Sequence, residues 1–268
     1  MPDVWSTVAE LDPTMQSRLA DVLETRGADI QQRTMRLSFL DDVPFPPEAR
    51  VVEVGCGTGV LTRVLAERPE VGDAIGIDPA ASLLERARLL SDGIARIGFL
   101  EGDGRALPLE DGSFDVVVFD STLSHIPGAE QALTEAFRVL RRPGWLAAFD
   151  GDYATTTVAL GDFDPLQACV DMMMANSVND RYLMRRLPAL VRRCGFEVEQ
   201  LRSHGFVDTS GNGYMVTVVE RGIDMLQSSQ QITADTAVAL RDEVLRRAMD
   251  GTFFGHIAYS SLIARKPA

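Results

Sequence analysis

Cysteine and histidine, which serve many metal sites and covalent mechanisms, are scarce: the chain of 268 residues has three of each. Cys56, Cys169 and Cys194 are odd in number and lack the spacing of metal ligands. We therefore predict neither a metal site nor a framework of disulfides. Free thiols suit a reducing compartment, so we expect the protein in the cytoplasm.

Long apolar runs are also lacking. No stretch approaches the roughly 18 to 20 apolar residues that cross a bilayer. The opening sequence MPDVWSTVAELDP has no basic region followed by an apolar run, so it does not read as a secretory signal. We expect no stable association with a membrane.

Positive charge is limited and dispersed. The chain has 26 Lys and Arg against 39 Asp and Glu, a formal net charge of −13. Proteins that bind nucleic acid gather Lys and Arg to contact phosphates. The sequence thus argues against a nucleic-acid substrate and leaves a small molecule as the expected partner. Nothing in it determines the oligomeric state, so a homodimer stays open.

The chain divides into a helical beginning and a longer α/β region. Residues 1–48 have helical patterning, and Asp12 followed by Pro13 is typical of a helix start. We predict a helical cap over 1–48 and a core over 49–268. A second helical stretch at 206–252 lies inside that core, and we expect it to contribute to the cap.

Within the core, short apolar runs alternate with helical periodicity, which indicates a largely parallel sheet. Strands are predicted at 50–55, 73–79, 96–103, 114–120, 145–153, 195–205 and 253–266. Helices are predicted at 58–68, 82–91, 130–141 and within 163–194. RPGW, residues 142–145, is predicted as a turn before the fifth strand.

The strongest motif is VVEVGCGTG, residues 51–59. Glycines after a strand allow a tight turn and let a ligand reach backbone N–H groups. Glu53, at the strand end, suits a cationic ligand group. A dinucleotide site would need G-x-G-x-x-G, but Val60 stands where its third glycine belongs. A nucleotide-binding oxidoreductase is therefore disfavoured.

Acidic residues end the following strands. Asp78 closes the second strand, where a carboxylate can accept hydrogen bonds from ribose hydroxyls. Asp103 ends the third strand and is placed to receive an exocyclic amine. Asp120 and Ser121 end the fourth. Ligands of open parallel sheets lie beyond the carboxyl ends of the strands, so these side chains predict one shared site.

Five segments together resemble the class I S-adenosylmethionine methyltransferases, especially the branch of ubiquinone and menaquinone C-methyltransferases and bacterial natural-product enzymes. They are EVGCGTG, IGIDP, EGDGRALP, SFDVVVFDSTLSHI and EAFRVLRRPGWL, within residues 50–153. The resemblance implies an α/β, Rossmann-like fold with a seven-stranded, mostly parallel sheet, an antiparallel last strand and a helical cap. It also implies S-adenosyl-L-methionine as cofactor and S-adenosyl-L-homocysteine as product.

The same resemblance implies a role for each motif residue. The methionine part of the cofactor would be held by Glu53, Gly55, Cys56, Gly57 and Gly59. We expect Cys56 to be a small buried side chain rather than a nucleophile. Asp78 would bind the ribose, with Pro79 beside the adenine. The remaining positions are Asp103 and Gly104 at the adenine amine, and Asp120 and Ser121 beside the methionine end.

The three histidines are His125, His204 and His256. An imidazole can remove a proton from an oxygen or nitrogen acceptor. His125, just past the fourth strand, is our candidate for a catalytic base, although a packing role for it stays open. His204 and His256 are weaker candidates.

The mechanism implied is an in-line displacement in a pocket closed by the cap, where orientation and exclusion of water supply most of the rate. The acceptor atom can be O, N or C. One alternative is a protein of this fold that binds the cofactor or its product without transferring methyl, as a sensor or a scaffold for another reaction. Methylation of protein side chains has no positive signal.

Overall fold

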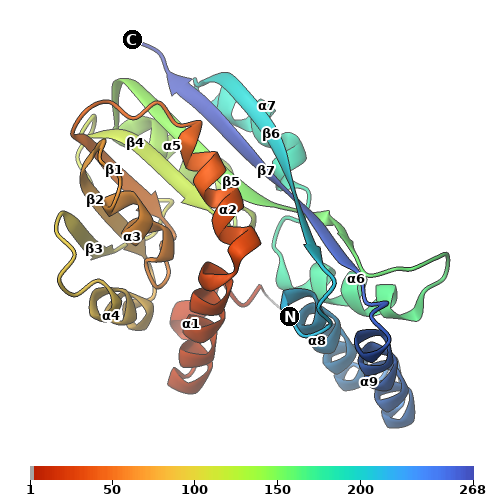
Figure 1. The fold of residues 1–268 in the computed structure, drawn as a ribbon. Coiled ribbons are helices and arrows are strands. Elements are labelled where there is room, and N and C mark those ends of the chain that lie inside the picture. The colour runs from red at the N-terminus through yellow and green to blue at the C-terminus, as the bar shows by residue number, and fades with distance from the viewer. Residues whose placement is uncertain (1–2) are drawn as a thin grey trace.

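The computed structural model describes residues 3–268 and contains one seven-stranded sheet in the order β3-β2-β1-β4-β5-β7-β6 (Figure 1). The strands are β1 Ala49–Val54, β2 Val71–Asp78, β3 Ile97–Glu101, β4 Phe114–Asp120, β5 Leu140–Thr157, β6 Glu197–Asp208 and β7 Gly255–Lys266. The main helices are α1 Pro13–Ala28, α2 Ile30–Asp41, α3 Val60–Ala66, α4 Ala81–Leu90, α5 Ala129–Val139, α6 Pro165–Ser177, α7 Leu183–Arg193, α8 Tyr214–Ser228 and α9 Ala234–Met249. Two short 3-10 helices lie at Val8–Glu10 and Leu123–His125.

The predicted fold class is confirmed. Neighbouring strands from β3 across to β5 are parallel, and β7 runs antiparallel to both β5 and β6. The chain order reverses at β1, because β2 and β3 lie on one side of it and β4 on the other. The helices that follow β1 and β4 therefore pack on opposite faces, α3 in one core cluster and α5 in the other, and the carboxyl ends of these two strands are where open α/β sheets bind ligands.

The central strands β1 and β4 are buried on both faces, which explains their mainly apolar sequences. Val51 packs in one core cluster and its neighbour Val52 in the other, since successive strand residues point to opposite faces. Glu53, next along β1, is 3% exposed. Glu53 lies near the carboxyl end of β1, where the strand order reverses and a bound ligand could contact its carboxyl group.

The predicted turn at 142–145 is wrong. β5 begins at Leu140, and Gly144 and Trp145 pair with Lys266 and Arg265 of β7. Proline and glycine favoured a turn locally, but β7 extends far enough to pair with Gly144 and Trp145, while Arg142 and Pro143 pair with neither β4 nor β7. The register shift between Phe114 and Val116 of β4 accommodates the change of path.

Helices α6, α8 and α9 project together beyond the sheet (Figure 1). Close packing of α6 and α8 requires Gly222, because a Cβ there would lie 1.9 Å from the Cys169 carbonyl oxygen. Met173 and Met174 are buried in this contact.

The stretch predicted as helical at 206–252 starts as strand, since β6 continues to Asp208. Within residues 3–268, none of the helices is both long enough and apolar enough to cross a bilayer.

Helices α1 and α2 lie at the sheet's ligand edge. Asp12 caps α1 as predicted, accepting a hydrogen bond from the Met15 N–H at 3.0 Å. Asp29 caps α2 in the same way through the Gln32 N–H. The two helices thus begin at well-defined residues, and α1 crosses the loop that follows β1.

Candidate cofactor and acceptor site

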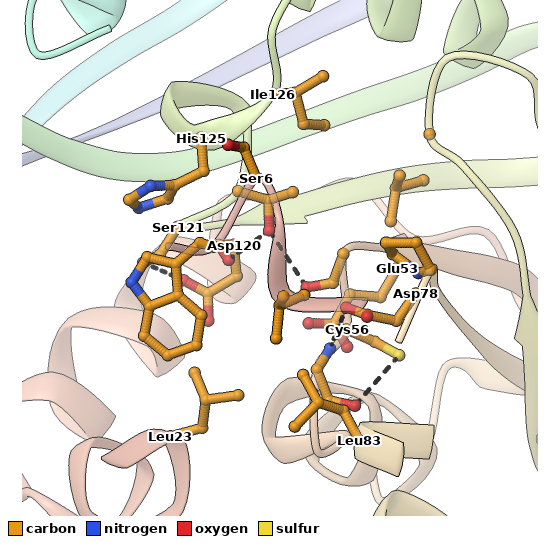
Figure 2. A pocket seen from close by; sticks show the side chains of 18 of the residues that line it. Ser6, Leu23, Glu53, Cys56, Asp78, Leu83, Asp120, Ser121, His125 and Ile126 are labelled. Atoms are coloured by element: carbon orange, nitrogen blue, oxygen red, sulfur yellow. Dashed lines mark hydrogen bonds between the residues drawn. The ribbon is translucent and has the colours of Figure 1, made fainter. Parts of the chain in front are cut away.

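One cavity of about 300 Å³ opens at the carboxyl ends of β1, β2 and β4. In Figure 2, Glu53 and Asp78 lie on one side of it and Asp120, Ser121 and His125 on the other. The predicted site residues that line it are Glu53, Gly55, Cys56, Gly57, Asp78, Pro79, Asp103, Gly104, Asp120, Ser121 and His125. Gly59 is not among the lining residues.

The glycine loop has left-handed backbone at Gly55, Gly57 and Gly59, with φ of 75°, 53° and 76°. A Cβ on Gly55 would lie 2.2 Å from Thr122 Cγ2, so this glycine also lets the loops after β1 and β4 meet. Gly59 begins α3, and a Cβ there would lie 2.8 Å from the Phe99 ring. Gly59 therefore serves packing and helix initiation, while the first two glycines face the cavity.

Asp78 is locked in place at the end of β2. Its two carboxylate oxygens accept hydrogen bonds from the backbone N–H groups of Gly57 and Ala80, each at 2.9 Å. Burial raises the pKa of this carboxyl, while those two N–H groups oppose the shift. A carboxylate has about four lone-pair sites, so two acceptor positions remain for the hydroxyls of a ribose.

Glu53 is buried and accepts a hydrogen bond from the Thr62 hydroxyl. Burial raises its pKa to about 8, and the Thr62 bond opposes that shift. Glu53 is therefore largely protonated at neutral pH when no cation is beside it. A ligand cation in the cavity would restore its charge and gain an interaction little screened by water.

Asp120 forms a buried ion pair with Arg36 of α2, Nε to Oδ2 at 2.6 Å, and Ser121 donates to its other oxygen. Arg36 was not predicted from the sequence. Its Nη1 is buried and has no hydrogen-bond partner within residues 3–268. The signal was present, because Arg36 occupies the buried stripe of α2 beside Met35 and Phe39.

Asp103 is held by its neighbour Arg105, which donates from its backbone N–H and its guanidinium. The Arg105 side-chain bonds lower the pKa of Asp103. Its side chain remains 45% exposed, so the carboxylate keeps room for another donor. A role at the adenine amine stays a prediction.

His125 lies at the cavity wall and bridges two distant segments. Its Nδ1 is 2.6 Å from Asp3 Oδ2, and its Nε2 is 3.4 Å from the Tyr153 hydroxyl. An aspartate at Nδ1 fixes the orientation and tautomer of the ring, which leaves Nε2 as the nitrogen able to accept a proton. Asp3 is 6% exposed, and it was missed because nothing in the sequence connects residues so far apart.

The other two histidines lie away from the cavity. His204 Nε2 is 2.9 Å from the Ser261 hydroxyl, and His256 Nδ1 is 3.0 Å from the Phe206 carbonyl oxygen. Both interactions are between neighbouring strands. His204 and His256 therefore hold the sheet together and are not placed to serve an acceptor in this cavity. Asp115, at the start of β4, is likewise structural, accepting from the Arg50 N–H.

Residues 3–10, here called the N-terminal strap, close one side of the cavity. Trp5 through Glu10 line it. Asp3 anchors the strap by accepting from the Trp5 and Asn179 N–H groups as well as by contacting His125. Within residues 3–268, the lining includes no residue of 206–252, so a direct contribution of that stretch to the cap stays a prediction.

Several known proteins similar to this chain are methyltransferases. Residues 52–148 match the family described as a methyltransferase domain. The 2-phytyl-1,4-naphtoquinone methyltransferase of Thermosynechococcus vestitus is 35% identical over 119 residues, 44% of this chain and 53% of that protein. The demethylmenaquinone methyltransferase of Lactococcus lactis is 28% identical over 172 residues, 58% of this chain and 68% of that protein.

Structural similarity covers more of the chain. A solved structure from Bacillus halodurans, classed as a methyltransferase, superposes with a TM-score of 0.63 at 19% identity, over 87% of this chain and 98% of that one. This likeness concerns the fold alone. The chain matches only about half of the first curated relatives' own length. Residues 52–148 thus form a methyltransferase domain, and the sheet order and the cavity at the glycine loop agree with the class I, S-adenosylmethionine-dependent type that the motifs resemble.

Proposed function

We propose that this protein transfers the methyl group of S-adenosylmethionine to an O, N or C atom of a small molecule, releasing S-adenosylhomocysteine. The observation that carries the proposal is the shared cavity. It joins the glycine loop after β1, Asp78 after β2 and Asp120 after β4. The relatives named as naphthoquinone and menaquinone methyltransferases favour a ring-bearing acceptor of quinol type.

The cavity's donors and acceptors fit the proposed cofactor. Gly55 and Gly57 leave space that a Cβ would fill, and Asp78 keeps two acceptor positions for ribose hydroxyls. Glu53 offers a carboxyl to a cationic group. The unpartnered Nη1 of Arg36 supplies a donor for the cofactor's carboxylate. When bound, S-adenosylmethionine supplies an electrophilic methyl group on a sulfonium.

The protein's own contribution is then orientation and exclusion of water. The N-terminal strap covers the cavity, and Trp5 sits edge-on to His125 with ring centroids 6.3 Å apart. In our proposal His125 accepts a proton at Nε2 from an acceptor that must lose one, while Asp3 stabilises the resulting imidazolium. For an acceptor already ionised, His125 has only a positioning role.

Calorimetric titration with S-adenosylmethionine, S-adenosylhomocysteine and NADH tests the proposal. Micromolar binding of both adenosyl compounds and none of NADH is the expected result, followed by methyl transfer in a screen of quinol and phenol acceptors. Tight NADH binding, or no binding of either adenosyl compound, would contradict it. Binding without transfer to any acceptor class would favour the alternative of a cofactor-binding protein of this fold.

We also propose the kind of partner, the cellular location and the cap of the protein. The acidic chain, with its basic residues in ion pairs such as Arg36–Asp120 and Arg247–Asp164, favours a small molecule over nucleic acid. Cys56, Cys169 and Cys194 are all free thiols, which favours a cytoplasmic location. The helices within residues 1–48, with the strap, would act as the cap.

A further inference from the structure

Arg26, near the end of α1, is a cation of the cavity that makes no direct ion pair among residues 3–268. The cavity's other two arginines are paired with Asp120 and Asp103. Its Nε is buried and lacks a hydrogen-bond partner. A guanidinium removed from water without an anion is costly, so its retention here calls for a ligand.

Two tyrosines hold the Arg26 guanidinium in one position. The group lies over the Tyr214 ring, 5.4 Å from its centroid, and its Nη2 is 3.5 Å from the Tyr259 hydroxyl. Gln32 of α2 donates to the same hydroxyl at 2.9 Å. A planar guanidinium stacked on an aromatic ring keeps its N–H edge free for bidentate contacts with oxygen.

The location of Arg26 separates it from the proposed cofactor positions. Tyr259 belongs to β7 and Tyr214 begins α8. In the sheet order, β7 is two strands beyond β4, on the side away from β2 and Asp78. Arg26 therefore faces the part of the cavity that lies past Asp120, toward His125, where an acceptor would enter.

We infer that Arg26 binds an anionic oxygen of the methyl acceptor, a phenolate or a carboxylate. The acceptor is then an acidic small molecule, held by the guanidinium beside His125. This inference rests on the proposed function and narrows its substrate class. A phenolate also fits the quinol-type acceptor proposed above, because loss of its proton enriches the ring in electrons at the carbons next to the oxygen.

The test uses naphthalene probes bound to protein saturated with S-adenosylhomocysteine at neutral pH. The probes are 1-naphthoate, 2,4-dinitro-1-naphtholate and the neutral 1-naphthamide. We expect the better of the two anions to bind about tenfold or more tightly than the amide, as one hydrogen-bonded charge pair provides. The tighter anion then tells a carboxylate acceptor from a phenolate. Anions that bind no better than the amide overturn the inference without use of any variant.

The matched variants are Arg26→Met, Arg26→Lys and, as control, Arg33→Met, which removes an exposed charge from α2. Arg26→Met should abolish the preference for the anion, Arg26→Lys should keep part of it, and the control should keep all of it. Affinity for S-adenosylhomocysteine should change by less than about threefold in every variant, since these charges lie outside the cofactor contacts.

Two further outcomes distinguish failure of the Arg26 inference from failure of the proposed function. If Arg26→Met loses S-adenosylhomocysteine while Arg33→Met does not, Arg26 holds the cofactor and the inference is wrong although the proposed function stands. If wild-type protein takes up no S-adenosylhomocysteine, the proposed function itself fails, and the inference fails with it.

Discussion

At the residue scale, Asp78 combines two duties, because it fixes the glycine loop through the Gly57 N–H and faces the cavity. Asp78→Ala should weaken S-adenosylhomocysteine binding by about a hundredfold or more, since two hydrogen bonds to a charged group are lost. It should also lower the free energy of unfolding by about 1–3 kcal/mol, because two backbone donors lose their acceptor. Calorimetry and denaturant melts measure the two effects.

Two further variants serve as controls for the Asp78→Ala result. Asp78→Asn keeps one acceptor oxygen and should fold more stably than the alanine variant. Asp73→Ala, an exposed position on the same strand with its side chain 57% exposed, should leave binding unchanged. Unaltered affinity in both Asp78 variants would remove the ribose assignment.

The buried carboxyl of Glu53 predicts, also at the residue scale, that the free energy of unfolding depends on pH. Its pKa is raised to about 8 in the folded chain from 4.5, so the folded state holds a proton that the unfolded state releases. Stability from this group is therefore full below about pH 4.5 and is lost as pH rises toward 8. Between these limits, the unfolding free energy of wild type should fall more than that of Glu53→Gln, measured by urea melts across pH.

Glu53 should also release its proton when a cation binds. Titration with S-adenosylmethionine near neutral pH should then give a heat that changes with the ionisation enthalpy of the buffer, and Glu53→Gln should lose that change. A binding heat independent of buffer in wild type would mean that Glu53 stays protonated beside the ligand and does not act as its counter-charge.

At the scale of elements, the N-terminal strap packs in a core cluster with α1 and α4, and Asp3 ties it to the opposite side of the site. Asp3 joins it to His125 and to the Asn179 N–H. Asp3→Asn should release S-adenosylhomocysteine about tenfold faster, since one charge-assisted hydrogen bond weakens. Trp5 reports this directly in stopped-flow fluorescence once Trp145, the other tryptophan, is replaced by Phe.

The control for the strap is Asp21→Asn on α1, whose side chain is 71% exposed. Equal release rates in the two variants would mean that the strap does not limit exit of the ligand. Faster release in Asp3→Asn with unchanged melting temperature would assign the effect to strap opening rather than to loss of fold.

For the whole molecule, ligand binding should stabilise the fold as a unit, because the cavity joins the loops after four strands to the N-terminal strap and to helices α1 and α2. S-adenosylhomocysteine at about 100 times its dissociation constant should add about 2.7 kcal/mol. For a chain of this size, that corresponds to a rise in melting temperature of roughly 5 to 10 °C. NADH at the same concentration should give no shift, and a shift with NADH alone would contradict the site assignment.

Much of the fold followed from local pattern. The mainly apolar stretches predicted as strands at 50–55 and 114–120 became β1 and β4 close to these bounds, because a strand buried on both faces is mainly apolar. The prediction failed at Gly144 and Trp145, where local turn preference was overridden by pairing with β7. Such pairing depends on a partner more than a hundred residues away, which no local pattern records.

The sequence by itself determined the glycine loop and the acids at successive strand ends, because each belongs to a short local motif, and the resemblance of these motifs to class I methyltransferases indicated the class of cofactor. Only the tertiary structure decided which residues from elsewhere complete the site. Asp3 reaches His125, Arg36 reaches Asp120, and Arg26 reaches Tyr259 across the sheet edge. The physical reason is that the energy of a buried charge depends on the groups that surround it in space, and only folding brings those groups together.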